Sequence, residues 1–105
     1  MTEKLSSSQI QVALLEINST LPEKEQWVLE DGKLTKLFMF KSFISAFGWM
    51  SQVAIWSEKM NHHPEWSNIY NKVNVKLVTH EVNGISDLDI KLANKMEMIT
   101  QSLVK

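Results

Sequence analysis

A tight-turn signal between two apolar segments constrains the fold of this chain more than any other feature. Asp31 and Gly32 separate residues 26–30 from residues 34–40, and both segments are rich in apolar side chains. An Asp-Gly pair in this position favours a β-hairpin, because glycine accepts the positive φ that the turn requires. The sequence therefore predicts two antiparallel strands here.

A second pair of strands is predicted later in the chain. Residues 66–70 and 73–79 form the two segments, and Asn71 with Lys72 makes the short turn between them. In the later segment apolar and polar residues alternate, and a period of two places its Val and Leu side chains on the buried face of a sheet. His80 follows on the opposite parity, away from the packed side.

Three segments with apolar residues at helical spacing accompany the two hairpins. The first begins near Ser7 or Ser8 and ends before Pro22, because the residue that precedes a proline is biased away from helix. The second covers about residues 42–60, and the third opens at Ser86, which can cap it.

The element order α-β-β-α-β-β-α predicts an α+β fold. Two hairpins separated by a helix combine naturally into a four-stranded antiparallel sheet, with three helices packed on one face. With 105 residues and 44% hydrophobic content, the chain can build one core without covalent staples. Residues 1–105 are therefore expected to form a single domain.

The predicted helix over residues 42–60 carries more apolar surface than one buried face needs. The residues expected on its buried side are Phe43, Ala46, Phe47, Met50, Val53, Ala54 and Trp56. Ile44, Trp49 and Ile55 add apolar surface elsewhere on this helix. Because such a surface on a small domain usually contacts a partner chain, we expect a homodimer or homotetramer with this helix or its neighbours at the contact.

Charge and composition exclude several classes of function. The chain has 11 Lys and Arg residues against 12 Asp and Glu residues and no basic run, so we expect no direct nucleic-acid binding. The absence of cysteine excludes disulfides, thiolate zinc sites and thiol nucleophiles. No apolar run approaches the ~20 residues of a membrane span, and the first residues lack the apolar stretch of a signal peptide. The expected location is the cytoplasm.

All three histidines of the chain fall within one short window, at His62, His63 and His80. Histidine is the side chain whose ordinary pKa lies nearest neutrality, so this concentration favours proton chemistry, metal binding or both. Pro64 forces the adjacent pair out of the helix that precedes it.

Several interpretations of these histidines are open from the sequence. The adjacent pair could be a solvated helix C-terminus, where imidazole interacts well with the helix dipole. Three histidines can hold zinc, but adjacent ones point in divergent directions, and the His80-Glu81 pair lacks the second histidine of a helical zinc motif. Trp66 and Tyr70 favour instead a site for a flat heterocycle, which stacks on aromatic walls.

Two acidic residues near the histidines have alternative roles. Asp89 is either a first-turn acid of the last helix, favoured by the helix dipole, or an acceptor that orients an imidazole and fixes its tautomer. Glu58 has the same alternatives, and a surface charge on the preceding helix is the simpler one.

The histidines belong to a longer pattern that covers about residues 25–100. Its parts are Phe38, Phe40-Lys41, Phe43, Ala46-Phe47-Gly48, Glu58-Lys59-Met60-Asn61-His62-His63-Pro64-Glu65-Trp66, Asn68, Tyr70-Asn71-Lys72-Val73, Thr79-His80-Glu81, Gly84 and Asp89. This pattern resembles the pterin-4a-carbinolamine dehydratase family, and the His-His-Pro-x-Trp run with Thr-His-Glu downstream is its most specific part.

The resemblance implies a fold, a reaction and an assembly. The family fold is a small α+β domain with a four-stranded antiparallel sheet, and its members form dimers and tetramers. The family reaction removes water from a 4a-hydroxytetrahydropterin to give the quinonoid dihydropterin, in tetrahydrobiopterin recycling, with no metal and no bound cofactor. Animal members also act as dimerisation cofactors of a transcription factor, and nothing in this sequence supports that role.

The resemblance also implies roles for individual residues. It places His62 and His80 on the positions of general acid and base, and His63 on a binding or assisting position; departure of hydroxide and loss of a proton need such groups. The expected substrate-binding residues are Asn61, Val78, Thr79, Glu81 and Trp66, and the supporting residues are Asp89 and Glu58. The family pattern allows Asp at position 61, so an amide replaces a charged contact here.

Two other functions stay open from the sequence. A binding module would pair through the exposed helix face without catalysis, and would tolerate loss of the histidines but not polar substitution of Ile44 or Trp49. A zinc-dependent hydrolase would contain metal after purification, which a metal assay would reveal.

Overall fold

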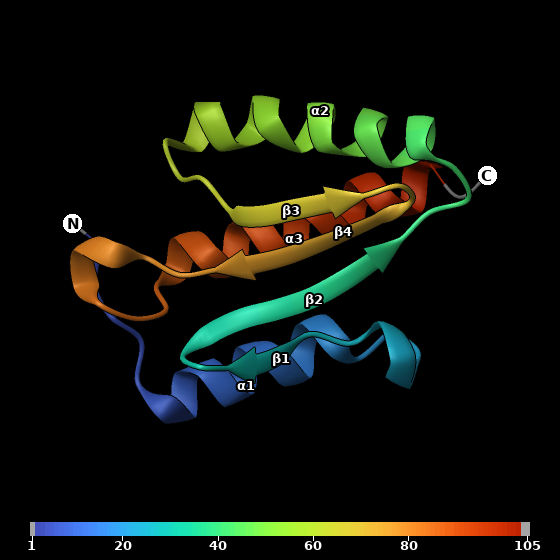
Figure 1. The fold of residues 1–105 in the computed structure, drawn as a ribbon. Coiled ribbons are helices and arrows are strands. Elements are labelled where there is room, and N and C mark those ends of the chain that lie inside the picture. The colour runs from blue at the N-terminus through green and yellow to red at the C-terminus, as the bar shows by residue number, and fades with distance from the viewer. Residues whose placement is uncertain (1, 104–105) are drawn as a thin grey trace.

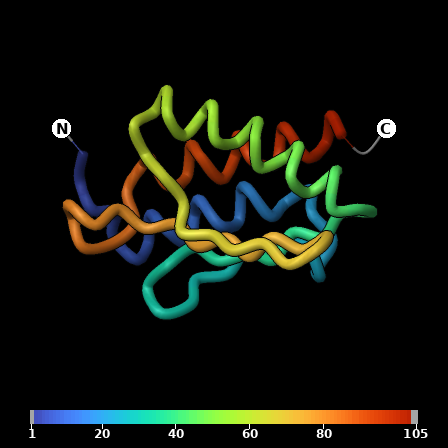
Figure 2. Tube along the Cα trace, turned by 45° about the horizontal axis from the view of Figure 1, so that its top comes forward, coloured from blue at the N-terminus to red at the C-terminus, as the bar shows by residue number. Residues whose placement is uncertain are grey.

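The computed structural model describes residues 2–103 and contains one four-stranded antiparallel sheet with three α-helices on one of its faces (Figure 1). Figure 2 shows the helices as a layer above the sheet. The elements are α1 (Ser7–Asn18), η1 (Glu23–Glu25), β1 (Val28–Glu30), β2 (Lys33–Met39), α2 (Phe43–Met60), β3 (Glu65–Ile69), β4 (Lys72–Leu77), η2 (His80–Val82) and α3 (Asp87–Leu103). The predicted fold class and element order are confirmed. Within the described residues, no helix is both long and apolar enough to cross a membrane.

The first hairpin has the predicted turn. Glu30 pairs with Lys33, and the two residues between them, Asp31 and Gly32, have positive φ values of 52° and 76°. Positive φ at both central residues defines a type I′ turn, whose twist matches that of the two strands.

The second hairpin turns one residue earlier than predicted. Tyr70 and Asn71 make the turn, with a φ of 53° at Tyr70, and Lys72 already pairs with Ile69 as the first residue of β4. Asn71 connects this turn to the end of β2: its Nδ2 donates to the Phe40 carbonyl at 2.8 Å, and the Phe40 N–H donates to the Asn71 carbonyl at 2.8 Å. These bonds fix the turn against the end of β2.

The strand order β1-β2-β4-β3 brings the two hairpins together through their inner strands. β2 and β4 pair from Leu34 opposite Leu77 to Met39 opposite Lys72. The alternation predicted for β4 is confirmed, because Val73, Val75 and Leu77 are fully buried under the helices. Their neighbours along the strand face the open side of the sheet.

Lys36 interrupts the apolar parity of β2 and is nevertheless buried, with 6% of its surface exposed. Its Nζ lies 2.6 Å from Oε2 of Glu97 on α3, and Nε1 of Trp27 donates to the same oxygen at 2.9 Å. The charge on the core face is therefore paired with a second buried charge, as burial of an ionised group requires.

The buried face of α2 differs from the predicted one. Ala46, Trp49, Val53 and Ser57 face the core, whereas Phe43 and Phe47 are about half exposed. Trp49, expected outside the core-facing stripe, is fully buried against Phe38, and its Nε1 donates to Thr100 Oγ1 of α3 at 2.9 Å. Apolar residues surround most of α2, so helical spacing alone does not select its inner face.

Four elements meet at one end of the domain. Figure 1 shows the C-terminal end of α2, the start of β3, the end of β4 with η2, and the N-terminal end of α3 on the same side. All three histidines lie in these segments, although His62 and His80 are separated by a whole hairpin.

Candidate functional site

The corner after α2 sends two adjacent histidines in opposite directions. Asn61 caps the helix in the left-handed conformation, and the His62 N–H donates to the Ser57 carbonyl at 3.0 Å. Pro64 prevents further helix, so the chain extends into β3. His62 is buried with 7% exposure, whereas the side chain of His63 is 58% exposed.

The third histidine comes from the loop between β4 and α3. Thr79 and Gly84 form an isolated antiparallel bridge, and the short helix η2 lies within the loop that they close. His80 begins η2 and its side chain is 74% exposed. The closed loop therefore holds His80 beside the corner that carries His62.

One hollow collects the three histidines. It has a volume of about 220 Å³ and is lined by Asn61, His62, His63, Val78, His80 and Glu81. Three larger hollows, of about 520 and 410 Å³ along α1 and of about 310 Å³ against the sheet, contain no histidine in their linings. Because chemistry needs reactive groups and not volume, the smaller hollow is the candidate site.

Each histidine is bonded through its Nε2 atom to a different carboxylate. The distances are 2.6 Å from His62 to Asp89, 3.0 Å from His63 to Glu58 and 2.8 Å from His80 to Glu65. An ionised carboxylate only accepts hydrogen bonds, so each Nε2 carries a hydrogen. Nδ1 is then the ring nitrogen that can exchange a proton with a ligand.

The pair formed by His62 and Asp89 is the most buried of the three. Asp89 is fully buried, and its Oδ2 accepts from the Thr79 hydroxyl at 2.7 Å and from the Ser86 N–H at 2.9 Å. Asp89 lies in the first turn of α3 as well, so the two roles considered for it occur together. In a dry site these bonds hold the carboxylate and the ring more firmly than they would in water.

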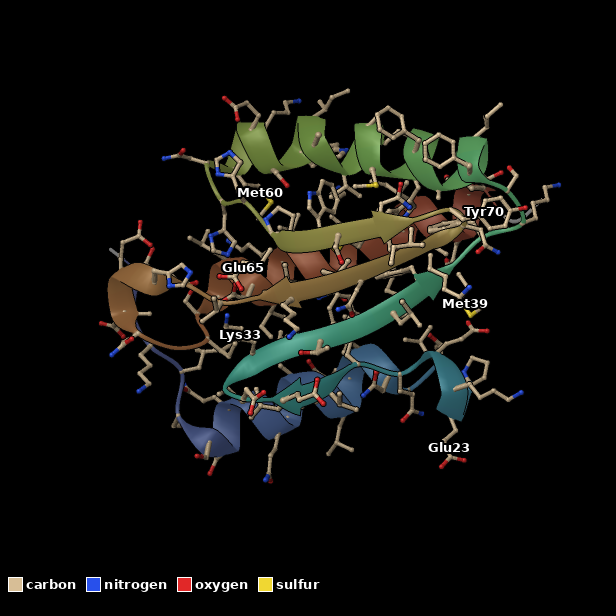
Figure 3. All side chains as sticks on the ribbon, viewed as in Figure 1. Glu23, Lys33, Met39, Met60, Glu65 and Tyr70 are labelled. Atoms are coloured by element: carbon tan, nitrogen blue, oxygen red, sulfur yellow. The ribbon has the colours of Figure 1, made fainter. Side chains whose placement is uncertain are left out.

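Glu65 belongs to the site and was missed by the sequence analysis. Its Oε1 lies 2.6 Å from Lys33 Nζ and its Oε2 lies 2.8 Å from His80 Nε2 (Figure 3). The bond from Lys33, and then that from His80, lowers the pKa of the Glu65 carboxyl. Lys33 is 32 residues away from Glu65 in sequence, so the pair could not be predicted. The one sequence signal for a role of Glu65 in the site is that Glu65 directly follows Pro64.

The aromatic walls predicted for the hollow are absent from its lining. Trp66 packs on the core instead, with its ring centroid 6.2 Å from that of Trp49. Figure 3 shows Tyr70 at the opposite end of β3 from Glu65, and Tyr70 is 62% exposed. Neither ring lines the hollow, and the substrate contact of Trp66 and the stacking role of Tyr70 stay predictions.

The side chain of Thr79 also lies away from the lining. Thr79 is 1% exposed, and its hydroxyl is bonded to Asp89 and Ser86. Asn61, Val78 and Glu81 do line the hollow. Within residues 2–103, no group of three or more His, Asp or Glu side chains is arranged to hold a metal ion.

The fold and the hollow together define a small α+β domain in which three imidazoles, each bonded to a carboxylate, line one polar hollow. The sequence matches the family model of pterin 4 alpha carbinolamine dehydratases over residues 3–99, and the chain belongs to this family. The resemblance drawn from the histidine pattern is thereby confirmed.

Similar proteins cover almost the whole chain. A Roseobacter denitrificans protein, provisionally named pterin-4-alpha-carbinolamine dehydratase, is 48% identical over 104 residues, which span 94% of this chain and 98% of the relative. A Brucella ovis protein with the same provisional name is 49% identical over 86 residues, or 80% of this chain and 89% of the relative. The crystal structure of a transcriptional coactivator/pterin dehydratase from Brucella melitensis matches with a TM-score of 0.81 and 43% identity, covering 92% of this chain and 98% of that chain.

Proposed function

We propose that this protein dehydrates a 4a-hydroxytetrahydropterin to the quinonoid dihydropterin, in tetrahydrobiopterin recycling, by general acid–base catalysis from histidine. The single observation that carries the proposal is the hollow itself, where three imidazoles turn their Nδ1 atoms away from carboxylate partners. Family membership and the similar names of the relatives support the reaction class.

The reaction needs one acid and one base. The C4a–O bond breaks and the oxygen leaves as water after taking a proton, while N5 loses its proton and forms a double bond to C4a. We assign these two transfers to Nδ1 of His62 and of His80, one as imidazolium and one as neutral imidazole. After each turnover a proton passes from one ring to the other through solvent, which restores the starting state.

The two proposed catalytic rings have complementary surroundings. His62 is buried against a carboxylate that stabilises the ring when it becomes charged, and its position is fixed by that bond. His80 is largely exposed and can exchange its proton with water, while Glu65 restrains its orientation. Each such group contributes on the order of 10²–10⁴ in rate.

We propose that the remaining residues of the lining hold the pterin. His63 would assist binding with Glu58 as its partner, and Asn61 and Glu81 offer an amide and a carboxylate to the polar edge of the ring. Val78 offers an apolar contact and its backbone. No metal or bound cofactor takes part in the proposed mechanism.

We also propose that the protein is a cytoplasmic homodimer or homotetramer. The exposed apolar surface of α2 supports this assembly, since Phe43, Ile44, Phe47 and Ile55 are 47%, 81%, 55% and 61% exposed. Such a surface usually contacts a partner chain. A coactivator role is described for the Brucella melitensis protein, and the present chain offers no observation that extends it here.

The proposal is tested by turnover of 4a-hydroxytetrahydropterin followed by absorbance. His62→Ala and His80→Ala should each lower the enzymatic rate by about a hundredfold, in line with the loss of one acid–base group. Tyr70→Phe is the matched control, because Tyr70 is an exposed ring far from the hollow and its replacement should leave the rate unchanged. Full activity in both histidine variants would refute the proposal.

A further inference from the structure

A chain of hydrogen bonds runs behind His62 through residues that have almost no contact with solvent. Thr79 is 1% exposed, and Ser86 and Asp89 are fully buried. They come from the end of β4 and the start of α3, while His62 follows α2. The chain therefore joins three elements of the fold behind the ring proposed to react.

The direction of each bond follows from the donors that are present. The Thr79 hydroxyl donates its one hydrogen to Asp89 Oδ2 at 2.7 Å. The contact of 2.7 Å between the hydroxyls of Ser86 and Thr79 must then use the hydrogen of Ser86. The Leu88 N–H donates to Ser86 Oγ at 3.2 Å, which agrees with this order.

These donors determine which oxygen of Asp89 faces the histidine. Oδ2 receives the Thr79 hydroxyl and the Ser86 N–H, so both of its contacts come from fixed groups. Oδ1 remains for His62 Nε2 at 2.6 Å. The backbone N–H cannot reverse its direction, so the carboxylate is not free to turn while the chain is intact.

We infer that Thr79 and Ser86 are positioning residues for the proposed reaction: they hold Asp89 so that His62 keeps its hydrogen on Nε2 and presents Nδ1 to the substrate. The expected effect on turnover rests on the proposed function. The expected effect on the His62 tautomer rests on the directions of the hydrogen bonds alone. It gives Thr79 a role behind the histidine in place of a substrate contact.

A purely structural role would be the simpler alternative. The same bonds connect β4 to α3 and close the loop around η2, so their loss would lower stability in either case. The two roles differ at the imidazole. Only positioning predicts that loss of the Thr79 hydroxyl changes the tautomer of His62 and the turnover number in a folded protein.

The experiment compares Thr79→Val, which keeps the shape and removes the hydroxyl, with Thr79→Ser, which keeps the hydroxyl. Thr100→Val is the control, since the Thr100 hydroxyl also makes two hydrogen bonds but lies away from the hollow: it accepts from Trp49 Nε1 of α2 and donates to the Met96 carbonyl of its own helix. The readouts are kcat and KM for the 4a-hydroxytetrahydropterin and the nitrogen NMR signals of the His62 ring.

Thr79→Val should lower kcat about tenfold with little change in KM, the size expected for one hydrogen bond to a charged group. Its His62 ring should pass from a single Nε2–H tautomer to a mixture. Thr79→Ser should restore both readouts, and Thr100→Val should lose stability without changing either. If Thr79→Val does not fold, Thr79→Ala takes its place, because it also removes the hydroxyl that donates to Asp89 Oδ2.

The inference is overturned if the variant that lacks the hydroxyl folds and keeps the wild-type His62 tautomer. It is also overturned if the tautomer and kcat change equally in Thr100→Val. Absence of turnover in the wild-type protein would instead refute the proposed function. The NMR comparison would still decide whether Thr79 and Ser86 position the ring.

Discussion

Replacement of Asp89 by asparagine should reverse the hydrogen-bonding polarity of His62. The Oδ2 position of Asp89 accepts from two donors, one of them the backbone N–H of Ser86, so only the amide oxygen of asparagine can occupy it. The amide NH₂ must then face His62 Nε2 at the Oδ1 position. Because NH₂ donates, Nε2 must become an acceptor and the ring hydrogen must move to Nδ1.

The reversed tautomer removes the neutral Nδ1 acceptor that the proposed mechanism needs when His62 is the base. It also removes the negative charge beside the imidazolium when His62 is the acid. We therefore expect kcat to fall by about a hundredfold or more for Asp89→Asn. The same kind of exchange in a serine protease triad lowers kcat by about 10⁴-fold through the wrong tautomer.

The matched control for this variant is Asp87→Asn on the same helical turn. Asp87 is 70% exposed and pairs with Lys91 at 3.3 Å, so it is a first-turn acid bonded to a lysine instead of a histidine. Both variants lose one charge at the N-terminus of α3, and a dipole effect alone would make them alike. The assay is turnover of the 4a-hydroxytetrahydropterin together with nitrogen NMR of the His62 ring. Equal rates for Asp89→Asn and Asp87→Asn, or an unchanged tautomer in Asp89→Asn, would refute the reasoning.

Three further predictions concern other parts of the domain. Glu65→Gln should lower kcat by up to about fivefold, since exposed ion pairs are weak. Because the bond from Lys33 lowers the pKa of the Glu65 carboxyl, its contacts persist at neutral pH and weaken only when the pH falls through that lowered pKa. Identical profiles of kcat against pH for the variant and the wild type would contradict this prediction. Lys36→Met should cost about 3–5 kcal/mol in urea unfolding by leaving Glu97 unpaired, and a smaller loss would show that the pair is dispensable. Ile44→Asp should yield monomers in sedimentation, and unchanged mass would exclude α2 from the interface.

The arrangement of elements could be predicted because its signals are local. Asp31 and Gly32 fix a turn by their backbone preferences, and Pro64 ends a helix wherever that helix packs. The alternation in β4 also reports directly on the buried face of the sheet. Such features depend on neighbouring residues, so one sequence is enough to find them.

Features that depend on distant partners could not be predicted. The inner face of α2 contains Trp49, whose Nε1 donates to Thr100, 51 residues further along the chain. Lys36 is accepted in the core because Glu97 lies opposite, 61 residues away. Periodicity describes one helix or strand at a time and does not contain these pairings.

The candidate site was predicted in part for the same reason. The histidines were found because the residue type itself is informative, and their convergence on one hollow agrees with the expectation. Glu65 was missed, and Trp66 and Thr79 were expected at the ligand, whereas neither residue is part of the lining of the hollow. The direction of a side chain at a strand end depends on the register with the neighbouring strand. The sequence pattern placed the turn between β3 and β4 one residue too late.

The central claim is that a pterin ring binds between Nδ1 of His62 and Nδ1 of His80. Titration of uniformly ¹⁵N-labelled protein with a stable dihydropterin tests it most directly, because the imidazole nitrogen signals report each histidine ring and the backbone amide signals report every other residue. The account predicts that the Nδ1 signals of both residues shift with one common Kd while both Nε2 signals keep their carboxylate bonds. Binding that leaves the three histidines unchanged and instead perturbs residues of the α1 hollow, such as Leu14 and Gln26, would contradict it.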